Sequence, residues 1–121
     1  MQFLIVDDSK AMRMIVRRTL RQAGFESCEA VEAANGMEAL KVLETAAPDL
    51  ILCDWNMPEM SGLELLKELQ NGGNRCKFGF VTSESTPEML GAAMEAGALF
   101  IITKPFTPEK FQETLQGVVG V

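Results

Sequence analysis

Four short apolar segments constrain the fold of this chain more than any other feature. Each is four residues long and is followed at once, or after one residue, by polar or charged residues: Phe3–Val6, Leu50–Cys53, Phe78–Val81 and Leu99–Ile102. Continuous apolar runs of this length are typical of strands buried on both faces of a parallel sheet. The intervening segments have helical periodicity, so the order of elements predicts a doubly wound α/β fold.

Capping residues predict where the helices begin and end. Ser9 can cap the helix after the first strand, and Gly24 is expected to stop it. A further strand is expected within Phe25–Ala33, where the alternation is weaker. The turn Asn35-Gly36 leads into a helix that should carry Met37, Leu40, Leu43 and Ala47 and end before Pro48.

Two later helices begin with the same arrangement. Thr86-Pro87-Glu88 and Thr107-Pro108-Glu109 each combine a capping threonine, a proline at the first helical position and an acid in the first turn. Between them lies the last expected strand, Leu99–Thr103. Earlier in the chain, the loop Asn56–Ser61 leads to a helix with leucines at helical spacing, Leu63, Leu66 and Leu69. The pattern therefore repeats strand and helix five times.

Bulk composition limits the function classes. At 121 residues, with 47% apolar and 23% charged residues, the chain is expected to form one domain over residues 1–121. We expect no membrane insertion, because no apolar stretch approaches the roughly 20 residues of a membrane span. A net charge of −6 argues against nucleic-acid binding. Three cysteines, Cys28, Cys53 and Cys76, are an odd count without CxxC spacing, which indicates a reducing cytoplasm.

The one basic cluster lies in the first helix. Arg13, Arg17 and Arg21 recur every four residues and so share one helical face. We expect a solvated face, with a docking surface for an acidic partner as the alternative.

Polar side chains with complementary chemistry follow the predicted strands. Asp7 and Asp8 follow the segment Phe3–Val6, and Asp54 follows Leu50–Cys53. Thr82 follows Phe78–Val81, and Lys104 comes after Leu99–Ile102. In an open parallel sheet these carboxyl ends meet at one edge, where ligands bind. Crowded carboxylates without histidine favour Mg²⁺, with Mn²⁺ possible, and Asp54 is the best candidate for a nucleophile that accepts a phosphoryl group.

These residues resemble those of a known family. The motifs Asp7-Asp8-Ser9, Asp54-Trp55-Asn56-Met57-Pro58, Thr82-Ser83 and Lys104-Pro105-Phe106, together with Gly62, resemble the receiver domain of bacterial response regulators, especially single-domain regulators of chemotaxis. The resemblance covers the whole chain. It implies a flavodoxin-like sheet of strand order 2-1-3-4-5 with helices on both faces.

The resemblance also implies a role for each acidic residue. Asp54 becomes the phosphoacceptor and, with Asp8, a direct Mg²⁺ ligand. Asp7 acts through water, and the backbone carbonyl of Asn56 supplies a further ligand. Histidine is absent from this chain, so a histidine kinase or phosphotransfer protein would be a separate donor, with small acyl phosphates as the other source.

The remaining motif residues match the parts of the family that respond to phosphate. Thr82 matches a hydroxyl that senses the phosphoryl group, Lys104 a lysine that contacts it, and Pro105 a proline held in cis. The family usually has Tyr or Phe three residues before the lysine, where this chain has Ile101, so we expect a smaller or differently routed conformational change.

The same resemblance indicates how the signal leaves the protein. The partner face of the family involves the fourth helix, the fifth strand with Ile101, and the segment Pro105-Phe106 leading into the fifth helix. Apolar residues on these elements, most of them expected to be core, are Met89, Met94, Ile101, Phe106 and Phe111. We expect a monomer that signals through an unnamed protein target.

Three other functions share parts of this pattern. A phosphorelay intermediate or phosphate sink would use the same acceptor. A flavin-binding module would need a phosphate loop after the first strand, where Asp7-Asp8 would repel the phosphate. A phosphatase with an aspartyl-phosphate intermediate would normally have an acid two residues after the nucleophile, where Asn56 stands. We therefore expect a phosphoacceptor with intrinsic Mg²⁺-dependent autophosphorylation and autodephosphorylation rather than a turnover enzyme.

Overall fold

Five parallel strands form one sheet in the order β2-β1-β3-β4-β5 in the computed structural model, which describes residues 1–119. The strands are β1 (Gln2–Val6), β2 (Glu29–Ala33), β3 (Leu50–Cys53), β4 (Phe78–Thr82) and β5 (Ile101–Thr103). The expected fold class and strand order are confirmed. Gly120 and Val121, which the prediction places at the end of the last helix, lie outside the described residues.

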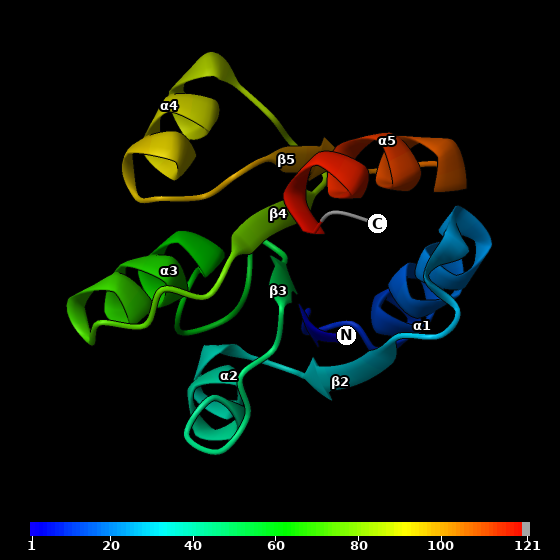
Figure 1. Cartoon of the computed structure of the whole chain (residues 1–121). Helices are drawn as coiled ribbons and strands as arrows, with labels where there is room; N and C mark the ends of the chain where they lie inside the picture. Colours follow the sequence, from blue (N-terminus) through cyan, green and yellow to red (C-terminus); the bar gives the residue numbers. More distant parts are fainter. Residues whose placement is uncertain (120–121) are drawn as a thin grey trace.

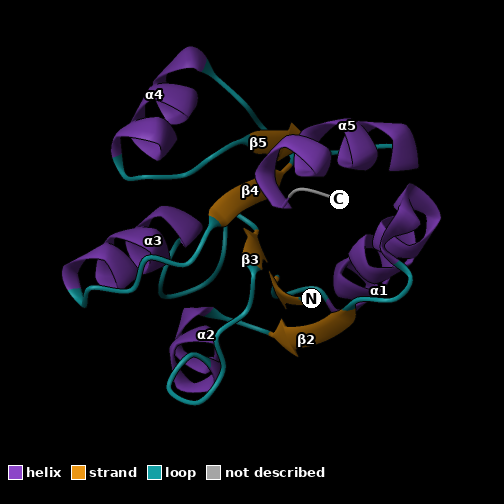
Figure 2. Ribbon diagram, viewed as in Figure 1, coloured by secondary structure: helices purple, strands orange, loops and turns teal. Residues whose placement is uncertain are grey.

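Helices cover both faces of the sheet, as Figure 1 shows. They are α1 (Lys10–Leu20) with a π-helical turn η1 (Arg21–Phe25), α2 (Gly36–Val42), α3 (Gly62–Asn71), α4 (Pro87–Glu95) and α5 (Pro108–Val119). Helices α1 and α5 lie on one side of the strands, and α2, α3 and α4 lie on the other (Figure 2). No helix within residues 1–119 has the length and hydropathy needed to cross a membrane.

Each face of the sheet has its own hydrophobic core. Alternate residues of β1 divide between the two cores, Phe3 and Ile5 with α1 and α5, Leu4 and Val6 with α2 and α3. Strand β3 is buried throughout, and β4 is buried along its whole length. The continuous apolar runs in the sequence therefore reflect strands covered on both sides.

The expected caps are present. Ser9 accepts a hydrogen bond from the Met12 amide at 3.2 Å, and Thr86 accepts one from Met89 at 3.1 Å. Thr107 accepts from the Lys110 amide at 3.1 Å. Gly24 has φ of 101° within η1, a conformation that glycine adopts without steric cost, so it ends the first helical segment as expected.

Two predicted boundaries are wrong. The helix expected to run to Ala47 ends at Val42, because the chain then closes in tighter turns such as Thr45 N–H to the Val42 carbonyl at 3.2 Å. Its buried positions are Gly36 and Ala39, while Met37 is 61% exposed. The last strand begins at Ile101, and Leu99, although its N–H donates to the Phe78 carbonyl at 2.8 Å, is exposed.

Phe100, just before the last strand, and Ile101, its first residue, face opposite sides of the sheet. Ile101 packs in the core beneath α2, α3 and α4, whereas Phe100 lies in the core beneath α1 and α5. The Phe100 ring occupies the space over Gly79, where a Cβ would lie only 2.1 Å from the ring. Phe100 is therefore a packing residue of the opposite face and does not replace the aromatic that Ile101 lacks.

Phe111 is one of the apolar residues of the expected partner-face elements that belong to the core, as most of them were expected to. It lies on the buried face of α5, and the partly buried Phe106 packs against it with ring centroids 4.7 Å apart. The exposed large apolar residues on α4 and just before β5 are Leu90, Met94 and Leu99. Only Met94 of these was expected there.

Candidate functional site

The three predicted carboxylates meet at the carboxyl edge of the sheet. Asp7 follows β1, Asp54 follows the adjacent β3, and one oxygen from each of Asp7, Asp8 and Asp54 lies within 4.8 Å of the others. Asp7 and Asp54 are buried, whereas Asp8 is exposed. The cluster therefore has two inner acids and one acid that faces solvent.

Lys104 is the cation that reaches the two inner acids. Its Nζ lies 3.3 Å from Asp7 Oδ2 and 3.7 Å from Asp54 Oδ2. The lysine arrives from the residue after β5, two strands away from Asp54, and its N–H donates to the Thr82 carbonyl at 2.7 Å. One ammonium thus bridges two carboxylates that would otherwise repel each other.

The charged form of the Asp54 carboxyl remains disfavoured despite this contact with Lys104. Burial raises its pKa above the usual aspartate value, and the neighbouring Asp7 charge raises it further. Lys104 and hydrogen bonds from the Trp55 and Asn56 backbone oppose the rise. Burial and the like charge of Asp7 together outweigh these contacts, so an additional cation would stabilise the charged form of Asp54.

Thr82 lies at the end of β4, between the strands that present Asp54 and Lys104. Its side chain is fully buried, and among the described residues its Oγ1 has no hydrogen-bond partner. A buried hydroxyl without a partner costs free energy, so it is available to any acceptor that enters the site.

The loop after Asp54 is held close to the acidic cluster. Gly62 N–H donates to the Trp55 carbonyl at 2.8 Å, and a Cβ on Gly62 would lie 2.3 Å from the Asp54 carbonyl oxygen. Trp55 packs on Phe80 with ring centroids 4.7 Å apart. Asn56 is exposed in this loop, and the hydrogen bond from its backbone N–H to the Asp54 carboxylate acts to lower the pKa of Asp54.

Residues around Lys104 occupy the expected places. The Lys104-Pro105 peptide bond is cis, as the resemblance implied. Pro105 is exposed, and Ile101 pairs in register with Phe80 of β4. Ile101 and Phe106 are both partly buried, and they pack against the cores on opposite faces of the sheet.

Sequence reasoning missed two contacts that hold the acids. Cys53 Sγ lies 3.1 Å from the carbonyl oxygen of Asp54, and burial together with Asp54 raises the pKa of this thiol. The Ser9 N–H donates to Asp7 Oδ1 at 2.9 Å. The cysteine before Asp54 was an available signal, whereas the Ser9 contact uses a backbone N–H and leaves no trace in the residue type.

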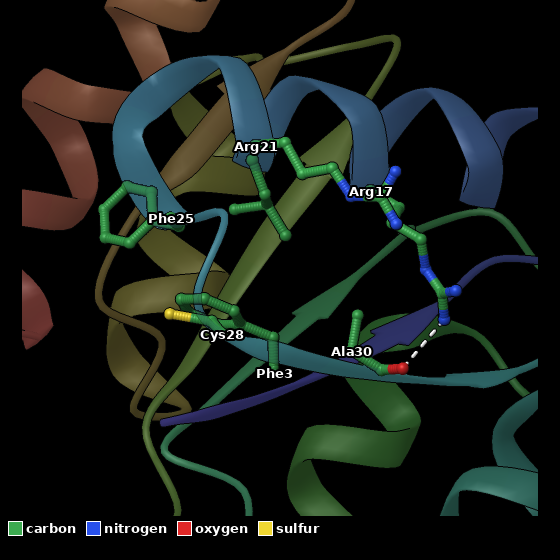
Figure 3. Close-up of a pocket in the computed structure, with 7 residues that line it drawn as sticks. Phe3, Arg17, Arg21, Phe25, Cys28 and Ala30 are labelled. Atoms are coloured by element: carbon green, nitrogen blue, oxygen red, sulfur yellow. Dashed lines mark hydrogen bonds between the residues drawn. The ribbon is translucent and has the colours of Figure 1, made fainter.

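A small cavity of about 60 Å³ lies away from this site. It is lined by side chains of α1, η1 and the beginnings of β1 and β2, including Phe3, Phe25 and Cys28 (Figure 3). Phe3 is near the start of β1, whereas Asp7 follows its end. The cavity is therefore separate from the carboxyl edge.

Comparison with known proteins agrees with the fold and the cluster. The family described as response regulator receiver domain matches residues 3–116. The chain belongs to this family of two-component signalling proteins.

Individual relatives match over nearly their whole length. The chain is 40% identical to chemotaxis protein CheY1 of Helicobacter pylori, covering 99% of this chain and 98% of that protein. It is 37% identical to a CheY homologue of Campylobacter jejuni, covering 99% and 93%. The solved structure of chemotaxis protein CheY4 of Vibrio cholerae superposes with a TM-score of 0.85, at 37% identity and 97% coverage of both chains.

Removing one of the crowded charges should stabilise the protein. Because the Asp54 pKa is raised, its charged form destabilises the folded state at neutral pH, and this effect disappears below the ordinary aspartate pKa. We expect Asp54→Asn to raise the Tm at pH 7 by about 4 °C, equivalent to about 1 kcal/mol for a domain of this size. At pH 3 the two Tm values should converge. A lower Tm for the variant at pH 7 would contradict the proposed crowding.

Proposed function

We propose that this chain is a phosphorylation-activated switch in which Asp54 accepts a phosphoryl group with the help of Mg²⁺. The observation that supports this most is the meeting of Asp7, Asp8 and Asp54 at one edge, with the Lys104 ammonium 3.7 Å from Asp54. Membership of the receiver family supports the same activity.

The acidic cluster fits a hard divalent cation. Its ligand atoms are all carboxylate oxygens, and burial leaves Asp54 short of compensating charge. Oxygen-only ligands suit Mg²⁺, and Mn²⁺ can take the same set. Asp8 and Asp54 would bind the ion directly, Asp7 through water, and Asn56 through its backbone carbonyl. The bound cation would offset the repulsion between Asp54 and an incoming phosphate.

Asp54 acts as the nucleophile. A carboxylate oxygen attacks phosphorus of a phosphohistidine or an acyl phosphate, a new P–O bond forms, and the bond from phosphorus to the donor nitrogen or oxygen breaks. The electron pair leaves with the donor, and the product is an aspartyl phosphate. The Lys104 ammonium lies 3.7 Å from Asp54 Oδ2, close enough to contact an oxygen of a phosphoryl group bound to Asp54.

Thr82 senses the product. Its buried hydroxyl lacks a partner among the described residues, so a phosphoryl oxygen on Asp54 supplies an acceptor that the unphosphorylated state does not. The gain of this hydrogen bond favours a shift of β4 toward the phosphate. Ile101, paired in register with Phe80, is the neighbour through which the shift reaches the last strand.

The chain is a switch and not a turnover enzyme in this proposal. Asn56 stands two residues after the nucleophile, where its amide cannot act as a general acid, so hydrolysis of the aspartyl phosphate is intrinsic and slow. Relatives named as chemotaxis proteins support a role in chemotaxis signalling. The donor is a histidine kinase, phosphotransfer protein or acyl phosphate in the cytoplasm, and the output is contact with a target protein.

Labelling with acetyl phosphate tests the acceptor. Incubation with acetyl phosphate and Mg²⁺ should add one phosphoryl group to the wild type, measured by intact-protein mass spectrometry. Asp54→Asn should remain unlabelled, while Asp49→Asn, which changes an exposed aspartate just before the opposite end of β3, should be labelled like wild type. Equal labelling of Asp54→Asn and wild type would remove Asp54 as the acceptor.

The substitution at Ile101 tests the route of the switch. A two-state shift from 1:99 to 99:1 needs about 5.5 kcal/mol, and isoleucine offers less area for inward burial than an aromatic ring. On binding beryllofluoride, amide NMR shifts around β5 should be smaller in wild type than in Ile101→Tyr. Thr82→Val, which lacks the hydroxyl, should lose the shifts in β4. Identical β5 shifts in wild type and Ile101→Tyr would refute this role.

A further inference from the structure

Arg13 connects the acidic cluster to the edge strand of the sheet. Its Nη1 donates to the carbonyl oxygen of Asp7 at 2.7 Å, and its Nε donates to Glu32 Oε1 at 2.9 Å. The side chain is only 14% exposed. The predicted solvated basic face is therefore wrong for Arg13, because its guanidinium is held by two acceptors from different elements.

The carbonyl that Arg13 holds belongs to the peptide group between Asp7 and Asp8. This group is planar, so fixing its oxygen fixes the direction in which the chain continues to Asp8. On the other side, the Asp7 N–H donates to the Ala33 carbonyl at 3.1 Å, next to Glu32. A closed ring of contacts therefore surrounds the start of the β1–α1 loop. It runs from Asp7 to Ala33, along β2 to Glu32, and through Arg13 back to Asp7.

We propose that Arg13 is a positioning residue that holds the Asp7–Asp8 peptide so that the Asp8 carboxylate stays within reach of Asp54. Asp8 is the exposed member of the cluster, so the position of its carboxylate depends most on a fixed backbone. Its importance for Mg²⁺ rests on the proposed function. The positive charge of Arg13 would by itself weaken binding of a divalent cation, so a positioning role and a charge effect have opposite signs.

Arg17 provides a matched control. It lies one turn further along α1 and pairs with the same carboxylate, Nη2 to Glu32 Oε2 at 2.9 Å. Its other contact is the Ala30 carbonyl at 2.7 Å, the dashed line in Figure 3. No contact joins Arg17 to Asp7 within the described residues. Lysine at either position keeps the charge but lacks the planar fork that reaches two acceptors.

Mg²⁺ titration separates the two arginines. Affinity is measured by calorimetry and by fluorescence of Trp55, the only tryptophan of the chain. We expect Arg13→Lys to raise the Kd about tenfold, as loss of a residue supporting metal ligands typically does. Arg17→Lys should stay within about twofold of wild type. Arg13→Met should also weaken binding, whereas a pure charge effect would tighten it.

A measurement without metal gives the second readout. The Ser9 N–H donates to Asp7 Oδ1, so its amide exchange in Mg²⁺-free protein reports the order of this loop. Exchange of Ser9 should be faster in Arg13→Lys and unchanged in Arg17→Lys, while the Ile51 amide of β3 should exchange equally in both.

The two readouts distinguish the possible failures. If wild type binds Mg²⁺, equal behaviour of the Arg13 and Arg17 variants in either measurement overturns the positioning role. If wild type itself does not bind Mg²⁺, the metal part of the proposed function fails, and Ser9 exchange alone then decides whether Arg13 holds the loop.

Discussion

Repulsion among three carboxylates at one edge of the sheet is the interaction on which the rest of this site depends. Two unit charges about 4 Å apart at an effective dielectric near 20 interact by about 4 kcal/mol. Lys104 contacts Asp7 and Asp54, but burial and like charge still raise the Asp54 pKa. The folded protein therefore keeps an excess of negative charge at this edge of the sheet, which an additional cation would offset.

The fold tolerates this repulsion because its strands are otherwise buried in two apolar cores. Strand β3 leads directly into the crowded Asp54, and all four residues of the strand are buried. The same rigid strands set the distances within the site. Asp54 and Lys104 come from strands that are not adjacent, and Thr82 of the strand between them is the residue whose hydroxyl is left without a partner among residues 1–119.

The sheet and the acidic cluster could be predicted from the sequence because each functional residue follows a buried apolar run at once or after one residue. Parallel pairing then brings Asp7, Asp54 and Lys104 to one edge without any knowledge of loops. The helix caps were predictable for a similar reason, since Ser9 and Thr86 satisfy amide groups only three residues away.

Contacts that depend on packing could not be predicted in this way. Arg13 binds a backbone carbonyl, which no side-chain pattern reveals, and Glu32 comes from an edge strand whose alternation was weak. The sequence could not separate core residues from exposed ones on α4 and α5, because helical periodicity alone does not show which face of a helix meets the sheet; in the structure Phe111 is fully buried, whereas Leu90 is exposed.

A crystal structure with Mg²⁺ and beryllofluoride would test the central claim most directly, because beryllofluoride mimics a phosphoryl group on a carboxylate. We predict that beryllium bonds to an Asp54 oxygen, that Lys104 Nζ and Thr82 Oγ1 each contact a fluorine, and that the metal lies among Asp8, Asp54 and the Asn56 carbonyl. Beryllofluoride on another carboxylate, or a metal bound away from Asp8 and Asp54, would contradict the account.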